Sequence, residues 1–309
     1  MIDRDELRRK KQEECDAYVE QLHRMEPELA QISQKIGQLS LRLIRKGILQ
    51  KNLAEKQAID MQVQQLLQRR KEILGKYGLG EEVYEPKWDC PLCKDLGYIT
   101  PGEPCECLKK ERILQRKEES GLPRGLWEKN FENFDTSYYK DMYKIQEIVA
   151  YCRAFANQVA TTGYGNNLVL LGDVGRGKTH LSVAIATEVL ERGKRVFYTR
   201  VDEMIDLIRA AKFDGLQEEK MRFLKECDLL VLDDLGAENS SEFAINQLRI
   251  VLEERNLAGK SWIINSNLSL EKIEALYTSR VADRILEKGK VFQLTSDESI
   301  RLILRKDYM

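Results

Sequence analysis

Hydrophobic residues follow two different patterns in two parts of the chain. Over residues 1–80, apolar side chains recur in steps of four and three, a heptad spacing that predicts one buried face of a helix. The first stripe consists of Tyr18, Leu22, Met25, Leu29, Ile32, Ile36, Leu39 and Leu43. A second stripe consists of Ile59, Val63, Leu66 and Ile73.

These stripes predict a helical or coiled-coil arm of two or three antiparallel helices. Pro27 interrupts the first stripe, so the seam is either kinked there or split into two helices with Pro27 in a first turn. Gly47 is expected in a turn. An arm this thin has little core of its own. It either buries its own stripes as a bundle or presents part of this surface to a partner protein.

In the remainder of the chain, short apolar runs alternate with helical patterns, which predicts a parallel sheet flanked by helices. The expected strands are 167–171, 195–199, 229–235, 261–264 and 291–294. The expected helices are 143–159, 179–191, 202–211, 216–226, 242–257 and 276–287. The fold class is therefore α/β, and residues 120–309 are expected to form this domain.

The first of these strands runs directly into a glycine-rich loop of the form G-x-x-x-x-G-K-[ST]. The loop reads Gly172, Asp173, Val174, Gly175, Arg176, Gly177, Lys178 and Thr179, and His180 follows it. Glycines let successive N–H groups point at an anion, and the helix that follows adds its positive dipole end. These nine residues are expected to bind ATP, with Lys178 on the β- and γ-phosphates and Thr179 on Mg²⁺.

Two carboxylates, Asp233 and Asp234, close the apolar strand 229–235. In a parallel sheet that end lies on the same edge as the phosphate loop. Asp233 is expected to hold Mg²⁺, and Asp234 to orient or deprotonate the attacking water. The next strand ends in Asn265-Ser266-Asn267, and a polar residue there can reach the γ-phosphate side. The sequence thus predicts an ATPase.

Four of the seven cysteines lie close together, as Cys90, Cys93, Cys105 and Cys107. A C-x-x-C pair and a C-x-C pair flanking a short turn suit a tetrahedral zinc ion. A redox C-x-x-C is the alternative, but it would not need the second pair. Neither histidine of the chain is nearby, so all four ligands should be sulfur. Such a closed site is structural, and residues 81–119 are expected to form this zinc segment and a connector.

Charge and composition restrict the partners. The chain has 50 Lys and Arg against 51 Asp and Glu, a net charge of -1, so contact with nucleic acid would need a local patch. Arg209, Lys212 and Phe213 form one candidate patch for single-stranded DNA, or else an ordinary solvated helix end. The charged first residues and the lack of a long apolar run predict a cytoplasmic protein without membrane contact.

Taken together, the phosphate loop, the block around Asp233, the Ser266-Asn267 strand end and the Ser279-Arg280-x-x-Asp283-Arg284 helix resemble the AAA+ ATPases. The resemblance is to the DnaC/DnaI-type bacterial replicative helicase loaders and the related IstB transposition helpers, over about residues 120–305. The cysteine segment is similar to the zinc-binding part of DnaI-like loaders. As in that subgroup, the domain is expected to lack the helical lid of other AAA+ proteins.

The resemblance implies a role for several residues. These are Walker A for Lys178 and Thr179, Walker B for Asp233 and Asp234, sensor 1 for Asn267, and sensor 2 for Arg301. Arg284, with Arg280 as the other candidate, would be an arginine finger that reaches a neighbouring subunit. Self-association through the ATPase domain is therefore implied.

The implied function is that of an ATP-dependent loader. It would bind the hexameric replicative DNA helicase through its N-terminal region and load it, with single-stranded DNA binding, when DNA replication starts. An IstB-like helper of transposition shares the ATPase core but would not be expected to carry the cysteine segment. A nucleotide-gated binding module with slow turnover is a further alternative. A small-molecule kinase would need a substrate pocket and an arginine-bearing lid, and neither is visible.

Overall fold

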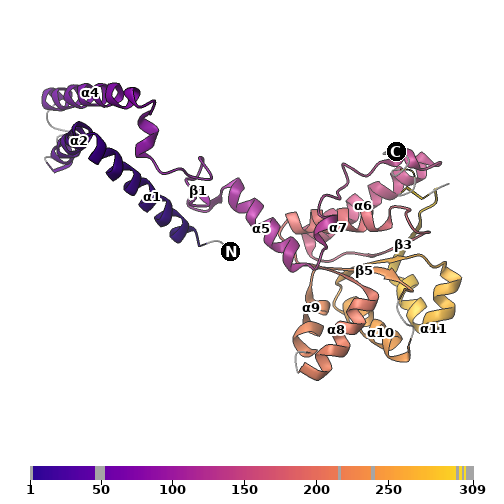
Figure 1. Ribbon diagram of the computed structural model, residues 1–309. Helices are drawn as coiled ribbons and strands as arrows, with labels where there is room; N and C mark the ends of the chain where they lie inside the picture. The colour runs from indigo at the N-terminus through magenta and orange to yellow at the C-terminus, as the bar shows by residue number, and fades with distance from the viewer. Residues whose placement is uncertain are drawn as a thin grey trace. The chain divides into compact units, whose positions relative to one another are not determined.

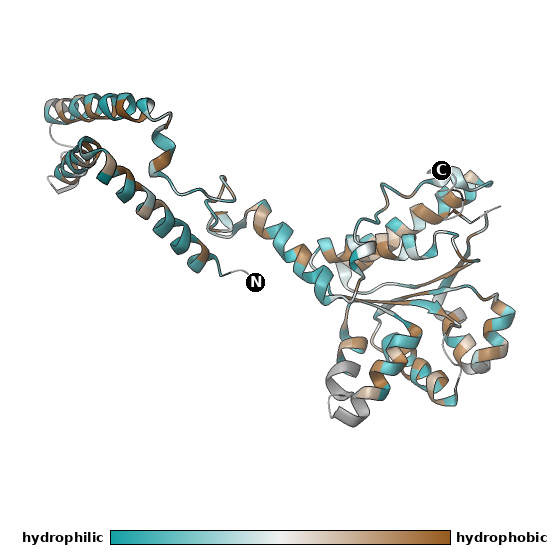
Figure 2. Cartoon of the chain, in the orientation of Figure 1, coloured by the Kyte–Doolittle hydropathy of each residue, from teal (hydrophilic) through white to brown (hydrophobic). Residues whose placement is uncertain are grey.

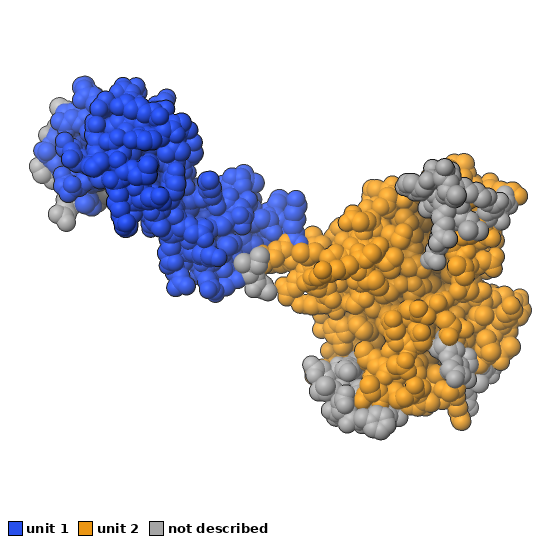
Figure 3. Space-filling view, in the orientation of Figure 1, with its two compact units in different colours: residues 1–110 blue, residues 111–309 orange. Residues whose placement is uncertain are grey.

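The computed structural model of the protein describes residues 3–45, 53–214, 217–237, 241–296, 299–300 and 303. Contacts between residues divide the chain into two compact units, Met1–Lys110 and Glu111–Met309 (Figure 3). The first contains the predicted helices and the clustered cysteines, and the second contains the sheet. None of the described helices is long and apolar enough to cross a membrane.

The first unit begins with the helices α1 (Arg4–Met25), α2 (Pro27–Arg45) and α4 (Leu53–Lys76). Pro27 is the first residue of α2, where the backbone N–H that proline lacks would have no partner within the helix. The first stripe is therefore divided between two helices. Both stripes contribute to one small core, whose buried members are Leu22, Leu29, Ile32, Ile73 and Leu74. The turn expected at Gly47 lies outside the described residues.

Short elements follow these helices. A 3₁₀ turn η1 (Glu81–Tyr84) precedes a two-stranded hairpin of β1 (Tyr98–Thr100) and β2 (Glu103–Pro104), which the sequence analysis did not predict. Strands of three and two residues are too short to show an alternating pattern. Helix α5 (Glu106–Glu119) begins directly after Cys105 and forms the predicted connector.

The second unit is built on five parallel strands in the order β4-β5-β6-β3-β7. In chain order they are β3 (Asn167–Leu171), β4 (Val196–Arg200), β5 (Leu229–Leu235), β6 (Ser261–Ser266) and β7 (Gly289–Gln293). The predicted α/β class is confirmed. The order places β5 and β6 side by side, and β6 next to β3. The phosphate loop and both sets of polar strand ends therefore meet at one edge.

Helices cover both faces of this sheet (Figure 1). On one face lie α6 (Met142–Thr162) and α7 (Lys178–Glu191), and on the other lie α8 (Val201–Asp214), α9 (Gln217–Glu226), α10 (Glu242–Leu257) and α11 (Leu270–Lys288). The 3₁₀ turns η2 (Arg124–Leu126) and η3 (Thr136–Tyr138) precede α6. Helix α11 starts six residues before the predicted position because the Ser269 side chain accepts from the Lys272 N–H and caps it.

Apolar side chains form a layer between the sheet and each set of helices. Figure 2 shows the hydrophobic residues gathered in the strands, whereas α1 is mostly hydrophilic. All five residues of β3 are buried, as expected for a central parallel strand covered on both faces. This rigid layer fixes the strand ends that carry the polar residues of the site.

Candidate nucleotide-binding site

The loop between β3 and α7 has the backbone geometry of a phosphate-binding loop. Gly172, Gly175 and Gly177 have φ angles of 145°, 79° and 87°, which residues with a Cβ atom rarely adopt. A Cβ at Gly175 would lie 2.1 Å from the Ser299 hydroxyl. Gly177 is the N-cap of α7, so the first N–H groups of that helix face the loop. Loop and helix together form an anion site.

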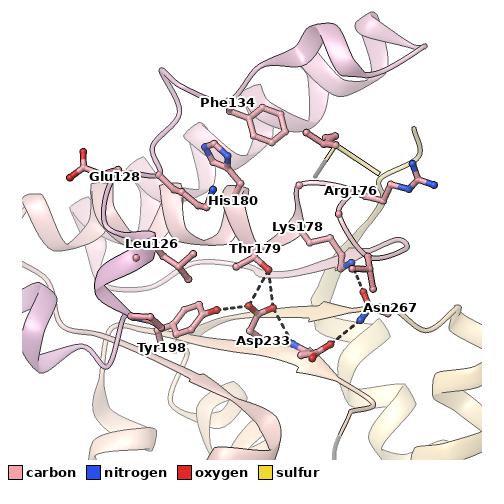
Figure 4. Close-up of a pocket in the computed structure, with 18 of the residues that line it drawn as sticks. Leu126, Glu128, Phe134, Arg176, Lys178, Thr179, His180, Tyr198, Asp233 and Asn267 are labelled. Atoms are coloured by element: carbon pink, nitrogen blue, oxygen red, sulfur yellow. Dashed lines mark hydrogen bonds between the residues drawn. The ribbon is translucent and has the colours of Figure 1, made fainter. Parts of the chain in front are cut away.

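Lys178 extends from the first turn of α7 back into the loop (Figure 4). Its Nζ donates to the carbonyl oxygens of Gly172 at 2.6 Å and Asp173 at 2.9 Å, and to Asn267 Oδ1 at 2.6 Å. The side chain is buried. Phosphate oxygens are acceptors of the same kind with more negative charge, so this ammonium is suited to bind them.

Thr179 and Asp233 meet although 54 residues separate them in the sequence. The Thr179 hydroxyl lies 3.1 Å from Asp233 Oδ2, and Asn265 Nδ2 donates to Asp233 Oδ1 at 2.9 Å. The Tyr198 hydroxyl donates to Oδ2. A hydroxyl and a carboxylate beside a phosphate loop are the oxygen ligands that Mg²⁺ takes with a nucleotide. The residues present therefore fit a magnesium ion.

Asp234 takes a left-handed backbone conformation, with φ 62°, at the end of β5. Its Oδ1 accepts from Asn267 Nδ2 at 2.9 Å, and its Oδ2 lies 3.6 Å from Arg200 Nη2. Asn267 thus contacts Asp234 and Lys178 at once. Such backbone strain at a carboxylate beside a cavity is typical of functional positions.

These groups line a cavity of about 940 Å³. Its opposite wall is formed partly by apolar side chains of the segment before α6, with Leu126, Phe134 and Tyr138. His180 secures this wall, because its Nε2 lies 2.9 Å from both Asn130 O and Asn133 Oδ1. Both partners are acceptors, so Nε2 carries the proton, and burial lowers the pKa of the imidazole. An apolar wall facing a phosphate loop suits a nucleobase.

Three further loop residues, Asp173, Val174 and Arg176, were also expected to bind ATP. The Arg176 guanidinium donates to Ser296 Oγ at 2.6 Å and lies 3.7 Å from Asp173 Oδ2. The Asp173 side chain is exposed, as is that of Val174 at the rim of the cavity. Val174 and Arg176 are among the residues that line the cavity.

The four clustered cysteines lie together in the first unit. All four Sγ atoms lie within 4.8 Å of one another. The separations are 3.7 Å between Cys90 and Cys105 and 3.4 Å between Cys93 and Cys107. Zinc bonded to four sulfurs at about 2.3 Å needs edges of about 3.8 Å, so the set fits a tetrahedral zinc ion.

Hydrogen bonds hold the turn after Cys90 in place. Asp95, which is buried and has φ 61°, accepts from the N–H groups of Asp89 and Cys90 at 3.0 and 2.7 Å. Gly97 N–H donates to Cys93 Sγ at 3.3 Å. Hydrogen bonds of this kind orient the ligands and reduce the charge on the sulfurs.

Comparison with known proteins identifies the family. The family model of IstB-like ATP binding proteins matches residues 112–307. The chain belongs to the IstB-like ATP-binding protein family. Its relatives include two proteins named as replicative helicase loaders, DnaI of Bacillus subtilis and DnaC of Escherichia coli, each 26% identical.

Individual relatives are distant. The uncharacterized protein YqaM of Bacillus subtilis is 27% identical over 267 residues, 68% of this chain and 83% of that protein. The replicative helicase loader DnaC of Escherichia coli is 26% identical over 196 residues, 63% of this chain and 76% of DnaC. The crystal structure of a DNA replication initiation factor is similar with a TM-score of 0.50 and 24% identity, covering 59% of this chain and 54% of that one. That likeness shows the shared fold.

Arg284, the first candidate for the arginine finger, lies outside the cavity of this IstB-like chain. Arg284 Nη2 lies 3.5 Å from Glu253 Oε1, and Arg284 is not among the residues that line the cavity. Arg280 is part of α11, but its side chain lies outside the described part of the chain, and so does all of Arg301.

The candidate DNA patch is described only at Arg209. Its Nη1 lies 2.9 Å from Asp206 Oδ1, and the guanidinium is 5.6 Å from the centre of the Phe243 ring. The side chains of Lys212 and Phe213 lie outside the described residues.

The sequence did not predict a role in the site for Tyr198, Arg200 or Asn265. Tyr198 and Arg200 lie on β4, where Arg200 pairs with Asp233 in register. In the sequence, the evidence for a role of these two residues is that polar residues lie at the carboxyl end of a predicted strand. This pattern indicates a site only when β4 is known to lie beside β5. Asn265 was noted as part of a polar strand end but was given no role.

Proposed function

We propose that this protein is an ATP-dependent loader of the replicative DNA helicase. The single observation that supports its ATPase chemistry most strongly is the convergence of Lys178, Thr179 and Asp233 on one cavity opposite an apolar wall. Membership of the IstB-like ATP-binding family and the likeness to a helicase loader support the cellular role. Such a loader would act in the cytoplasm.

The geometry suggests how each residue would contribute. Lys178 and the loop N–H groups would bind the β- and γ-phosphates, and the Leu126–Phe134 wall would take the base. Thr179 and Asp233 would hold Mg²⁺, which neutralises phosphate charge during transfer. Asp234 would orient the attacking water, while Asn267, bonded to both Asp234 and Lys178, would sense the γ-phosphate.

The site also requires a cation on the transferring phosphoryl group. Arg284 pairs with Glu253 on its own chain and does not line its own cavity. We infer that it completes the site of a second copy, so hydrolysis would depend on self-association. An arginine supplied in this way raises the rate of phosphoryl transfer by about 10³–10⁵.

We also propose that the ATP-bound protein binds single-stranded DNA near Arg209. The stacking of the Arg209 guanidinium on Phe243 resembles the pairing of cations and rings on which bases lie. Affinity for an oligonucleotide should fall as salt rises, because phosphate contacts release counterions. Binding that is indifferent to both salt and nucleotide would contradict this proposal.

A helper of transposition is the second candidate, because the matching family model is named for IstB. The cysteine segment and the helices α1, α2 and α4 favour the loader. Affinity capture from the source cell tests this directly. Tagged full-length protein with ATP should retain a hexameric helicase, and Lys178→Ala serves as the comparison for nucleotide dependence. Recovery of a transposase without helicase would favour the second candidate.

A further inference from the structure

Tyr198 brings a hydroxyl to the proposed magnesium ligand from the neighbouring strand. Its side chain is 5% exposed, and its hydroxyl donates to Asp233 Oδ2 (Figure 4). The same Asp233 oxygen accepts from the Thr179 hydroxyl at 3.1 Å.

The backbone of Tyr198 is bonded to the segment that follows α5. Tyr198 N–H donates to Ser120 O at 2.7 Å. Ser120 in turn is tied to the last turn of α5, because its hydroxyl donates to Lys117 O at 2.7 Å. Gly121 has φ 74°, and a Cβ there would lie 2.7 Å from Tyr198 O. The end of the connector and the side of the proposed magnesium site therefore meet at one residue.

We propose that Tyr198 is a positioning residue for Asp233, and that through Tyr198 the end of α5 acts on the magnesium side of the ATP site. The inference rests on the proposed ATPase function. It gives a physical path by which an event at the connector would change magnesium binding and hydrolysis.

The donors around Asp233 explain why one hydroxyl matters. Oδ1 accepts from Asn265 Nδ2 and from the Asp234 N–H, so two donors fix that side of the carboxylate. Oδ2 accepts from Tyr198 and Thr179, and Thr179 is itself a proposed magnesium ligand. If Thr179 were to bind Mg²⁺, Tyr198 would be the side-chain donor left to hold Oδ2 in place.

The test measures binding of a fluorescent ATP analogue to the full-length protein at rising Mg²⁺ and in EDTA. Tyr198→Phe removes only the hydroxyl. The variant should need about five- to tenfold more Mg²⁺ for half-maximal binding. A change of this size corresponds to the loss of one hydrogen bond. Binding in EDTA should stay unchanged, and kcat should fall more than KM rises. Tyr277→Phe removes a hydroxyl from a buried tyrosine outside the cavity and controls for packing.

Gly121→Ala tests the connection to α5. Its Cβ would push against Tyr198 O, so the Mg²⁺ requirement should rise as in Tyr198→Phe while EDTA binding is retained. If this variant does not fold, hydrogen exchange of the unmodified chain replaces it. Peptides covering 118–122 and 196–200 should then be more protected with ATP and Mg²⁺ than with ATP and EDTA.

These experiments distinguish failure of the proposed function from failure of the positioning role and of the link to α5. Wild-type protein that binds no ATP analogue overturns the proposed function itself. Wild-type protein with magnesium-dependent binding, together with an unchanged Mg²⁺ requirement in Tyr198→Phe, overturns the positioning role alone. An effect in Tyr198→Phe without one in Gly121→Ala, or without changed exchange at 118–122, overturns the link to α5.

Discussion

Lys178 and Asp233 occupy the same cavity and carry the opposite charges that a magnesium nucleotide requires. The buried ammonium of Lys178 is surrounded by three acceptor oxygens. The Asp233 carboxylate is surrounded by four donors, from Thr179, Tyr198, Asn265 and the Asp234 backbone. Because each charge is held in place before the ligand arrives, binding loses little entropy at these side chains.

Removal of the Lys178 ammonium should weaken nucleotide binding. Lys178→Ala deletes charge-assisted hydrogen bonds to the phosphates, worth about 1.5–3 kcal/mol, so the Kd for ATP should rise roughly 10- to 100-fold. Equilibrium binding of labelled ATP measures this. Lys290→Ala, at an exposed lysine on β7 outside the cavity, should bind like wild type. Equal affinity in both variants would contradict the assignment.

The two aspartates should affect turnover more than binding. Asp233→Asn and Asp234→Asn keep the size of each side chain but remove its charge. Both variants should bind ATP and hydrolyse it poorly, with kcat lowered at least about tenfold, because magnesium and the attacking water lose their carboxylates. Phosphate release under saturating ATP is the measurement. Undiminished turnover in both would rule out the proposed roles.

Among the elements, the cysteine segment should depend most on a metal. Its hairpin has strands of three and two residues, and both are largely exposed, so it buries little apolar surface of its own. The cysteine ligands and the Asp95 turn are what define its shape.

Purified protein should contain one zinc ion per chain. Removing it with a chelator should unfold residues 85–110, because metal binding supplies most of the folding free energy of such segments. Hydrogen exchange of that range measures the unfolding. ATP binding by the second unit, followed in parallel, should persist. Elemental analysis without zinc, together with four freely titratable thiols at Cys90, Cys93, Cys105 and Cys107, would refute the site.

At the scale of the whole molecule, the division into two units separates two proposed tasks. A truncation beginning at Glu111, the boundary of the second unit, removes the helices and the cysteine segment. It should keep ATP binding and lose helicase binding, because the proposed helicase-binding surface lies in the first unit. Affinity capture with equal amounts of full-length and truncated protein measures this. Helicase retained by the truncated form would assign the N-terminal helices another role.

The arginine finger predicts complementation between two inactive proteins. Lys178→Ala lacks a working phosphate loop but keeps Arg284, whereas Arg284→Ala has the reverse defect. If Arg284 acts in a neighbouring copy, a mixture should recover part of the ATPase rate, and the recovery should rise with concentration. If it only pairs with Glu253 within its own chain, the mixture should remain inactive at every concentration.

The sequence by itself determined the features that are encoded by neighbouring residues. The phosphate loop is one continuous stretch whose glycines dictate its backbone, and the strands and helices follow from local periodicity. The cysteine cluster could be predicted in the same way, because the two cysteines of each pair are only a few residues apart in the sequence. These patterns sufficed for the α/β class, the position of the phosphate loop and the clustered thiols.

The tertiary structure decided what depends on which strands become neighbours. Only the pairing of β4 with β5 brings Tyr198 to Asp233 and Arg200 to Asp234, and no local pattern encodes strand order. The tertiary structure also shows that the first stripe is broken, not kinked, at Pro27, and that Arg284 lies beside Glu253. Contacts between residues that are 30 to 50 positions apart arise from the packing of whole elements. They therefore could not be predicted from local sequence patterns.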